Sequence, residues 1–83
     1  KNTAVINLSL IQDFYERKVL DEKNPLSLKN LIDKKIINKK FSKLKILGKG
    51  EIKKKISVSA NFSSKQAKAK IEKAGGTLNI LKD

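Results

Sequence analysis

Positive charge constrains the fold of this chain more than any other feature of its sequence. Twenty Lys or Arg residues stand against eight Asp or Glu, a net charge of +12 over 83 residues. Self-repulsion of this size opposes a compact state unless an anionic partner neutralises it. A chain this short buries only about 60% of its unfolded surface, but its hydrophobic fraction of 39% is enough for folding. We therefore expect one small globular domain over residues 1–83 and a polyanionic partner.

The N-terminal segment is predicted to form a strand followed by a helix. Ala4–Leu8 is short and rich in β-branched residues, which favours a strand that enters the core. Apolar residues then recur at spacings of three and four, as on one face of a helix. Either Asn7 or Ser9 can cap this helix, and Gln12 follows Ser9 at the spacing of a capping box. We expect the helix to end within Tyr15–Lys18.

A second helix is predicted after a loop that contains the single proline. The proline biases the residue before it away from helical angles, so Asp21–Pro25 is predicted to be a loop. Ser27 is placed to cap a helix that ends near Lys34 or Lys35. The apolar face of this helix consists of Leu28, Leu31 and Ile32.

A pair of glycines predicts a β-hairpin in the middle of the chain. Leu44–Leu47 and Glu51–Val58 are strand-like, and Gly48–Gly50 lies between them. Two glycines in three residues suit the positive φ angles of a tight connection. Lys54 interrupts the apolar face of the second strand, which indicates a bulge or a solvated strand end. That face consists of Ile52, Ile56 and Val58.

The clearest local signal is a capped helix over Ser63–Gly76. Ser63 occupies the cap position and Gln66 follows at capping-box spacing. One residue of Gly75–Gly76 is expected to end the helix in the left-handed region, and Thr77–Leu81 alternates as a closing strand. The apolar face consists of Ala67, Ile71 and Ala74. The element order β-α-α-β-β-α-β places the chain in the α/β class.

The positive charge lies mainly in the second half of the chain. Residues 1–38 hold seven bases and five acids, whereas residues 39–83 hold thirteen bases and three acids. A lysine-rich run often only solvates a surface, but solvation needs charge of either sign, and the excess favours a phosphate-binding face. Such a face binds through counterion release, largely without reading base sequence. The predicted polyanion-binding residues are Lys39, Lys40, Lys43, Lys45, Lys49, Lys53, Lys54, Lys55, Lys65, Lys68, Lys70 and Lys73.

Other kinds of site have little support in the sequence. There is no cysteine or histidine, which removes thiolate metal sites and the commonest general base. Gly48–Gly50 is too short for a Walker loop and runs on into a strand, so Lys49 is at most a phosphate contact at a turn. Glu16, Asp21 and Glu22 lie among lysines in a loop expected to be exposed, where no pKa is driven far. We therefore expect no enzyme activity, cofactor, metal or small-molecule substrate.

The sequence also argues against a membrane partner. No apolar stretch approaches the roughly 20 residues that cross a bilayer, and no signal-like apolar run begins the chain. The last predicted helix has too thin an apolar face to anchor on a membrane surface. A cytoplasmic location is expected.

The aromatic residues are too few for a stacking platform of the RRM or OB type. Phe14 and Phe62 are predicted to lie in the core. Phe41, between Lys40 and Ser42, is a candidate for exposed stacking, although a packing role is favoured.

Several blocks of the sequence together resemble one ribosomal family. They are Val5–Leu8, the segment Lys45–Glu51, and Phe62–Ser63 followed by Ala67, Ile71–Glu72 and Ala74–Gly76. In this order and spacing they resemble ribosomal protein L fifteen of the bacterial large subunit, the universal family uL fifteen, over nearly the whole chain. The resemblance implies an irregular ββα-type α/β domain seated on large-subunit ribosomal RNA near neighbouring ribosomal proteins, without enzyme activity.

The family also has a glycine-rich basic N-terminal extension that enters ribosomal RNA, and none precedes Lys1. We therefore expect the chain to be the C-terminal globular part of a longer protein. The expected function is that of a structural constituent of the large ribosomal subunit, which binds ribosomal RNA through the lysine-rich face and supports subunit assembly in the cytoplasm. The alternative is a free nucleic-acid-binding module of the nucleoid or regulatory kind.

Overall fold

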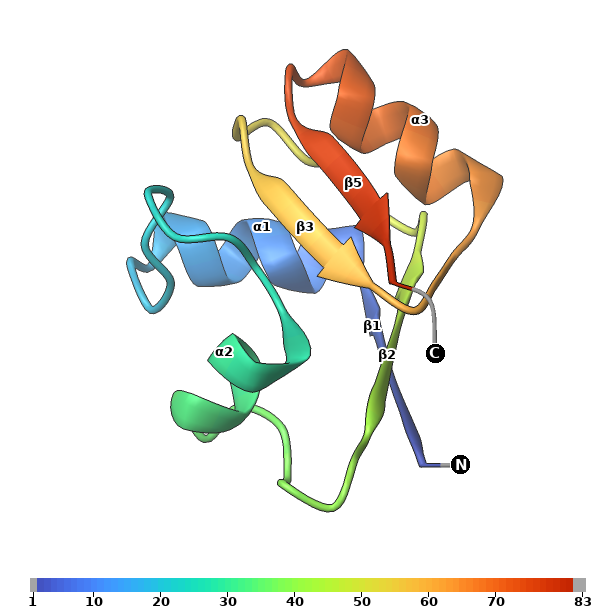
Figure 1. The fold of residues 1–83 in the computed structure, drawn as a ribbon. Helices are drawn as coiled ribbons and strands as arrows, with labels where there is room; N and C mark the ends of the chain where they lie inside the picture. Colours follow the sequence, from blue (N-terminus) through green and yellow to red (C-terminus); the bar gives the residue numbers. More distant parts are fainter. Residues whose placement is uncertain (1, 82–83) are drawn as a thin grey trace.

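The computed structural model describes residues 2–81, in which three helices and five strands follow one another (Figure 1). The elements are β1 (Thr3–Asn7), α1 (Leu8–Glu16), α2 (Leu28–Asp33), β2 (Lys43–Leu47), β3 (Ser57–Ala60), β4 (Phe62–Ser63), α3 (Lys65–Lys73) and β5 (Thr77–Ile80). The order β-α-α-β-β-β-α-β confirms the predicted α/β class and adds one short strand, β4. Residues 1, 82 and 83 of the predicted domain lie outside the described part of the chain.

The named strands form two small sheets, and within residues 2–81 every pair of them is parallel. One sheet has the order β1-β2-β4 and the other consists of β3 and β5. Parallel neighbours need a crossover connection instead of a tight turn, and α1 and α2 lie on the crossover from β1 to β2 (Figure 1). Across the first sheet the register pairs Val5 with Lys45, and Lys45 with Phe62.

The predicted hairpin is wrong. β2 pairs with β1 and β4, whereas the next strand begins only at Ser57 and pairs with β5 in the other sheet. Residues 48–56 form an irregular connection, so Lys54 lies in no strand and no bulge exists there. The apolar residues of the predicted strand face are nevertheless buried, since Ile52, Ile56 and Val58 all belong to the core.

The glycines of this connection serve close approach between segments. A Cβ on Gly48 would lie 2.6 Å from Cβ of Gln66, and a Cβ on Gly50 would lie 2.5 Å from Cβ of Ser9. Gly50 also has a φ of +90°, which glycine adopts at little cost. The backbone N–H of Ser9 donates to the Lys49 carbonyl at 3.1 Å. The connection therefore passes tightly against the first turns of α1 and α3.

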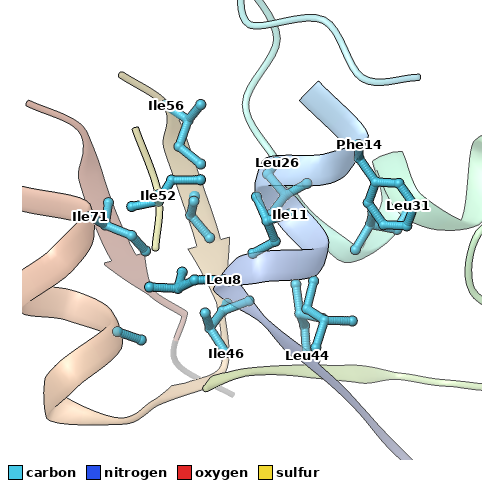
Figure 2. Packing of buried hydrophobic residues seen from close by; sticks show 14 of the residues in the cluster. Leu8, Ile11, Phe14, Leu26, Leu31, Leu44, Ile46, Ile52, Ile56 and Ile71 are labelled. Carbon is cyan, nitrogen blue, oxygen red and sulfur yellow. The ribbon is translucent and has the colours of Figure 1, made fainter. Parts of the chain in front are cut away.

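The core is one contiguous apolar cluster to which both sheets contribute. Figure 2 shows Leu44 and Ile46 of β2 projecting toward Leu8 and Ile11 of α1. Ile71 of α3 joins the same cluster and is completely buried. Within residues 2–81 no polar or charged residue is buried. The charge of this part of the chain therefore lies on its surface, where solvent or an anion can reach it.

Each helix begins at a side-chain cap, and two of the caps were predicted correctly. Asn7 accepts from the backbone N–H of Leu10 at 2.9 Å, and Ser27 accepts from that of Asn30 at 3.2 Å. Such caps satisfy backbone donors that the first turn leaves unpaired. The first helix therefore uses Asn7, one of the two residues predicted as alternatives, and the second uses Ser27.

Both predicted capping boxes are wrong. The side chain of Gln12 accepts from the backbone N–H of Lys53 at 2.8 Å, so it ties α1 to the connection instead of closing a box with Ser9. The last helix is capped by Ser64, which accepts from the backbone N–H of Ala67 at 3.1 Å. Ser63 belongs to β4, a strand that was not predicted from the sequence. Gly75 has a φ of +88° and confirms the left-handed residue after the helix.

Candidate nucleic-acid interface

The side chain of Lys70 links α3 to the irregular connection of residues 48–56. Its ammonium donates to the carbonyls of Gly48 and Gly50 at 2.9 and 2.8 Å, and lies 3.2 Å from a carboxylate oxygen of Glu51. These three contacts occupy the ammonium, although about a third of the side chain is exposed. Lys70 therefore positions the connection, and any phosphate contact would come in addition to this role.

Other predicted lysines surround this contact. Lys53 and Lys73 line a shallow hollow together with Lys70, Glu51 and Ala74. The stem of Lys55 passes beside Gly75, since a Cβ at that glycine would lie 3.7 Å from its Cγ. The structure therefore brings Lys53, Lys70 and Lys73 together at one hollow. The predicted lysines of the connection and of α3 that are exposed are Lys49, Lys53, Lys55, Lys65, Lys68 and Lys73.

Lys54 points toward a different part of the molecule. Its ammonium lies 3.4 Å from a carboxylate oxygen of Glu22, and its side chain is one-third exposed. The pair joins the connection to the loop before α2. Because surface ion pairs are weak, this contact leaves the charge of Lys54 accessible to a competing phosphate.

The remaining four predicted lysines lie on β2 and the turn before it. Along β2, Lys45 is exposed while Leu44 and Ile46 are completely buried, so the strand presents lysine on one face and the core on the other. Lys39 and Lys40 are exposed, and Lys43 is half-buried.

Two of these four lysines lie over aromatic rings. Lys40 places its ammonium 5.4 Å from the centre of the Phe41 ring, and Lys43 places its ammonium 5.8 Å from the centre of the Phe62 ring. Both distances are within the range of a cation–π contact. Lys40 and Lys43 therefore each carry their charge beside an aromatic ring.

Phe62 is the aromatic residue whose predicted position is wrong. It was predicted in the core but is 46% exposed on the outer face of β4. Its polar neighbours, Asn61 and Ser63, were the available signal of an exposed position. Phe14 is buried as predicted, and Phe41 is half-buried against the core, as the favoured packing role required.

The electrostatics of this surface favour an anionic partner. Three acids follow residue 38. Glu51 forms an ion pair with Lys70, and Asp83 lies outside the described part of the chain. The thirteen bases of this half therefore greatly outnumber the acids that could neutralise them. A lysine cluster with such an excess of charge attracts phosphates, and it does so without base specificity.

The phenol of Tyr15 has a displaced pKa. Burial raises its pKa to about 12, and the nearby carboxylates of Glu22 and Asp21 act in the same direction. A phenol held neutral in this way is a poor proton donor and acceptor near neutral pH. Within residues 2–81 there is also no group of three or more potential metal ligands.

None of the helices in the described residues is both long and apolar enough to cross a membrane.

The sequence is similar to a family of ribosomal proteins and to named members of the large subunit. Residues 5–79 match a family described as ribosomal proteins, which includes 50S-L15 and 50S-L18e together with a 60S protein. A protein named large ribosomal subunit protein uL15 from Pelagibacter ubique is 44% identical over 79 residues, which cover 95% of this chain and 52% of the relative. The protein of the same name from Prochlorococcus marinus is 41% identical, over 98% of this chain and 49% of the relative. The chain therefore spans about half the length of the curated relatives it matches.

Proposed function

The chain belongs to the uL15 family of ribosomal proteins, and from this membership we propose that it serves as a structural constituent of the large ribosomal subunit. In this role it binds large-subunit ribosomal RNA through its lysine-rich face and supports subunit assembly. Membership in a family of ribosomal proteins agrees with the prediction that the chain is not an enzyme.

One observation supports RNA as the ligand above all others. Thirteen bases and three acids follow residue 38, and the described lysines of this half are on the surface. Ribosomal RNA presents a dense array of phosphates, and a protein that neutralises them gains affinity from the counterions released. The charge that opposes folding of the isolated chain then becomes the source of its binding energy.

The proposed RNA-binding residues are the exposed and half-exposed lysines of the connection, of α3, of β2 and of the turn before it. Lys70 is expected to contribute mainly by holding the connection in place, because its ammonium already contacts two carbonyls and Glu51. The proposed partners are large-subunit ribosomal RNA and neighbouring ribosomal proteins. The proposed location is the ribosome in the cytoplasm, where residues 1–83 act as one globular domain.

The proposal is tested by co-sedimentation of the full-length protein with ribosomal subunits. The tagged protein is expressed in cells, and large subunits are isolated on a sucrose gradient before and after a high-salt wash. We expect the protein to stay with the large subunit after the wash, in an amount close to that of other large-subunit proteins. Release by salt, or sedimentation with chromosomal DNA, would instead identify a free nucleic-acid-binding module.

A further inference from the structure

A row of three exposed side chains crosses the outer face of the β1-β2-β4 sheet. Val5, Lys45 and Phe62 are register partners on adjacent strands, so their side chains lie side by side on one face. Val5 is 53% exposed and Phe62 is 46% exposed, whereas Leu44 and Ile46 on the opposite face are completely buried. This face therefore presents apolar surface to solvent on either side of a lysine.

The same face is positively charged. Lys45 is exposed, and Lys43 lies two residues away on β2 with its ammonium 5.8 Å from the Phe62 ring centre. The three strands, all within the described chain, contain no acidic residue.

We propose that an unpaired nucleotide of RNA docks on this face, with its base stacked on Phe62 and its phosphate neutralised by Lys45. The inference rests on the proposed function, since it specifies one contact within a larger RNA interface. Every base has a π-face, so stacking on an aromatic side chain tolerates sequence. A neighbouring lysine then supplies the charge that the same nucleotide requires.

The chemistry of the face favours a nucleotide over a protein segment. An apolar protein partner would have to bury Lys45 between Val5 and Phe62, and burying a charge without a partner is costly. A nucleotide satisfies both groups, because its base is flat and apolar on its faces while its phosphate is anionic. The positive balance of the chain points to the same ligand.

The test compares Phe62→Leu with Phe62→Tyr in the full-length protein. Leucine keeps apolar volume at the sheet edge but cannot stack, whereas tyrosine retains the aromatic ring. Binding to a fluorescent single-stranded oligouridine, and to an abasic strand with the same number of phosphates, is measured by anisotropy at several salt concentrations. Thermal melting of each variant checks that folding is unchanged, as expected for an exposed side chain.

We expect Phe62→Leu to weaken binding to oligouridine about tenfold, within the range of base–aromatic stacking, and Phe62→Tyr to bind as the unmodified protein does. The slope of log affinity against log salt should not change for Phe62→Leu, because the ring releases no counterion. Lys45→Gln should lower that slope by about 0.7, the value for one phosphate on a single strand. On the abasic strand, Phe62→Leu and the unmodified protein should bind equally.

Two results would overturn the stacking inference. If Phe62→Leu binds both strands normally while Lys45→Gln weakens binding, phosphate contact stands and base stacking is wrong. If Phe62→Leu binds RNA normally but loses a crosslink to a neighbouring ribosomal protein on the subunit, the face is a protein interface. Release of the unmodified protein from large subunits by the high-salt wash would instead reject the proposed function itself.

Discussion

Ser64 is the single residue on which the start of α3 depends. Its hydroxyl oxygen accepts from the backbone N–H of Ala67 at 3.1 Å and from that of Gly48 at 3.1 Å. Ser64→Ala removes both acceptors and should lower the free energy of unfolding by about 1–2 kcal/mol. Urea denaturation followed by circular dichroism measures this loss.

Ser63→Ala is the matched control for this substitution. The hydroxyl of Ser63 donates to the carbonyl of Ser64, at 2.9 Å, and caps no helix, so its removal should cost about 0.5 kcal/mol or less. If Ser63→Ala destabilised the protein as much as Ser64→Ala, the assignment of the cap would be wrong.

Tyr15 gives the domain a dependence on alkaline pH. Its pKa is raised from 10.0 to about 12 in the folded chain, mainly by burial. Because the raised pKa favours the neutral phenol, its contribution to stability is complete below pH 10.0 and is lost as pH rises through about 12. Tyr15 is the only tyrosine, so ultraviolet absorbance of tyrosinate follows this group alone.

The same titration in concentrated urea should return the phenol to its ordinary pKa. Comparison of unfolding free energies with Tyr15→Phe over the same pH range isolates the contribution of the phenol. A titration of the folded protein at the ordinary value would show that the ring is open to solvent.

At the scale of elements, the junction between α3 and β5 depends on two glycines for different reasons. Gly75 has a φ of +88°, whereas a Cβ on Gly76 would lie 2.2 Å from the carbonyl oxygen of Ile56. Gly75→Ala should cost about 1 kcal/mol, the penalty of a left-handed residue. Gly76→Ala should cost more, about 2 kcal/mol or above, because the overlap is with backbone that also accepts from Thr77.

Urea denaturation of both variants gives the order of the two losses. The prediction requires Gly76→Ala to be the less stable protein. A greater loss for Gly75→Ala would mean that backbone conformation, and not the close approach of the segment before β3, limits this junction.

At the scale of the whole molecule, the uneven charge predicts which lysines carry RNA affinity. Lys53, Lys54 and Lys55 lie in the highly charged half, and changing all three to Gln should weaken binding to large-subunit RNA. The slope of log affinity against log salt should also become shallower, because fewer counterions are released. Filter binding of the full-length protein at several salt concentrations measures both effects.

A triple Gln variant of Lys29, Lys34 and Lys35 is the control, since it removes equal charge from the balanced half of the chain. We expect the smaller loss for this variant. Equal losses would mean that only net charge matters, and a larger loss for the control would place the RNA-binding face on the first half.

Local features of the fold were predictable because they depend on residues a few positions apart. Asn7 and Ser27 each cap a helix through a backbone N–H three residues later, and Gly75 follows its helix closely. The cap of α3 was misplaced by one residue because Ser63 and Ser64 are adjacent and only the position of β4 separates their roles. The basic half was likewise visible from composition alone.

The tertiary structure decided what depends on distant partners. In the sequence, Gly48 and Gly50 are compatible with a hairpin turn. In the structure β2 pairs in parallel with β1, and the two glycines instead allow close approach to α3 and α1. Lys70 is indistinguishable in sequence from other lysines, yet its ammonium contacts Gly48, 22 residues away. The exposure of Phe62 follows from its place on the outer face beside Lys45.

By itself, the sequence therefore determined the helices, two of their three caps and the excess of charge, because these arise from neighbouring residues. Strand partners, and the surface groups that they bring together, were decided only by packing of the whole chain, because the contacts that fix them join residues far apart in the sequence.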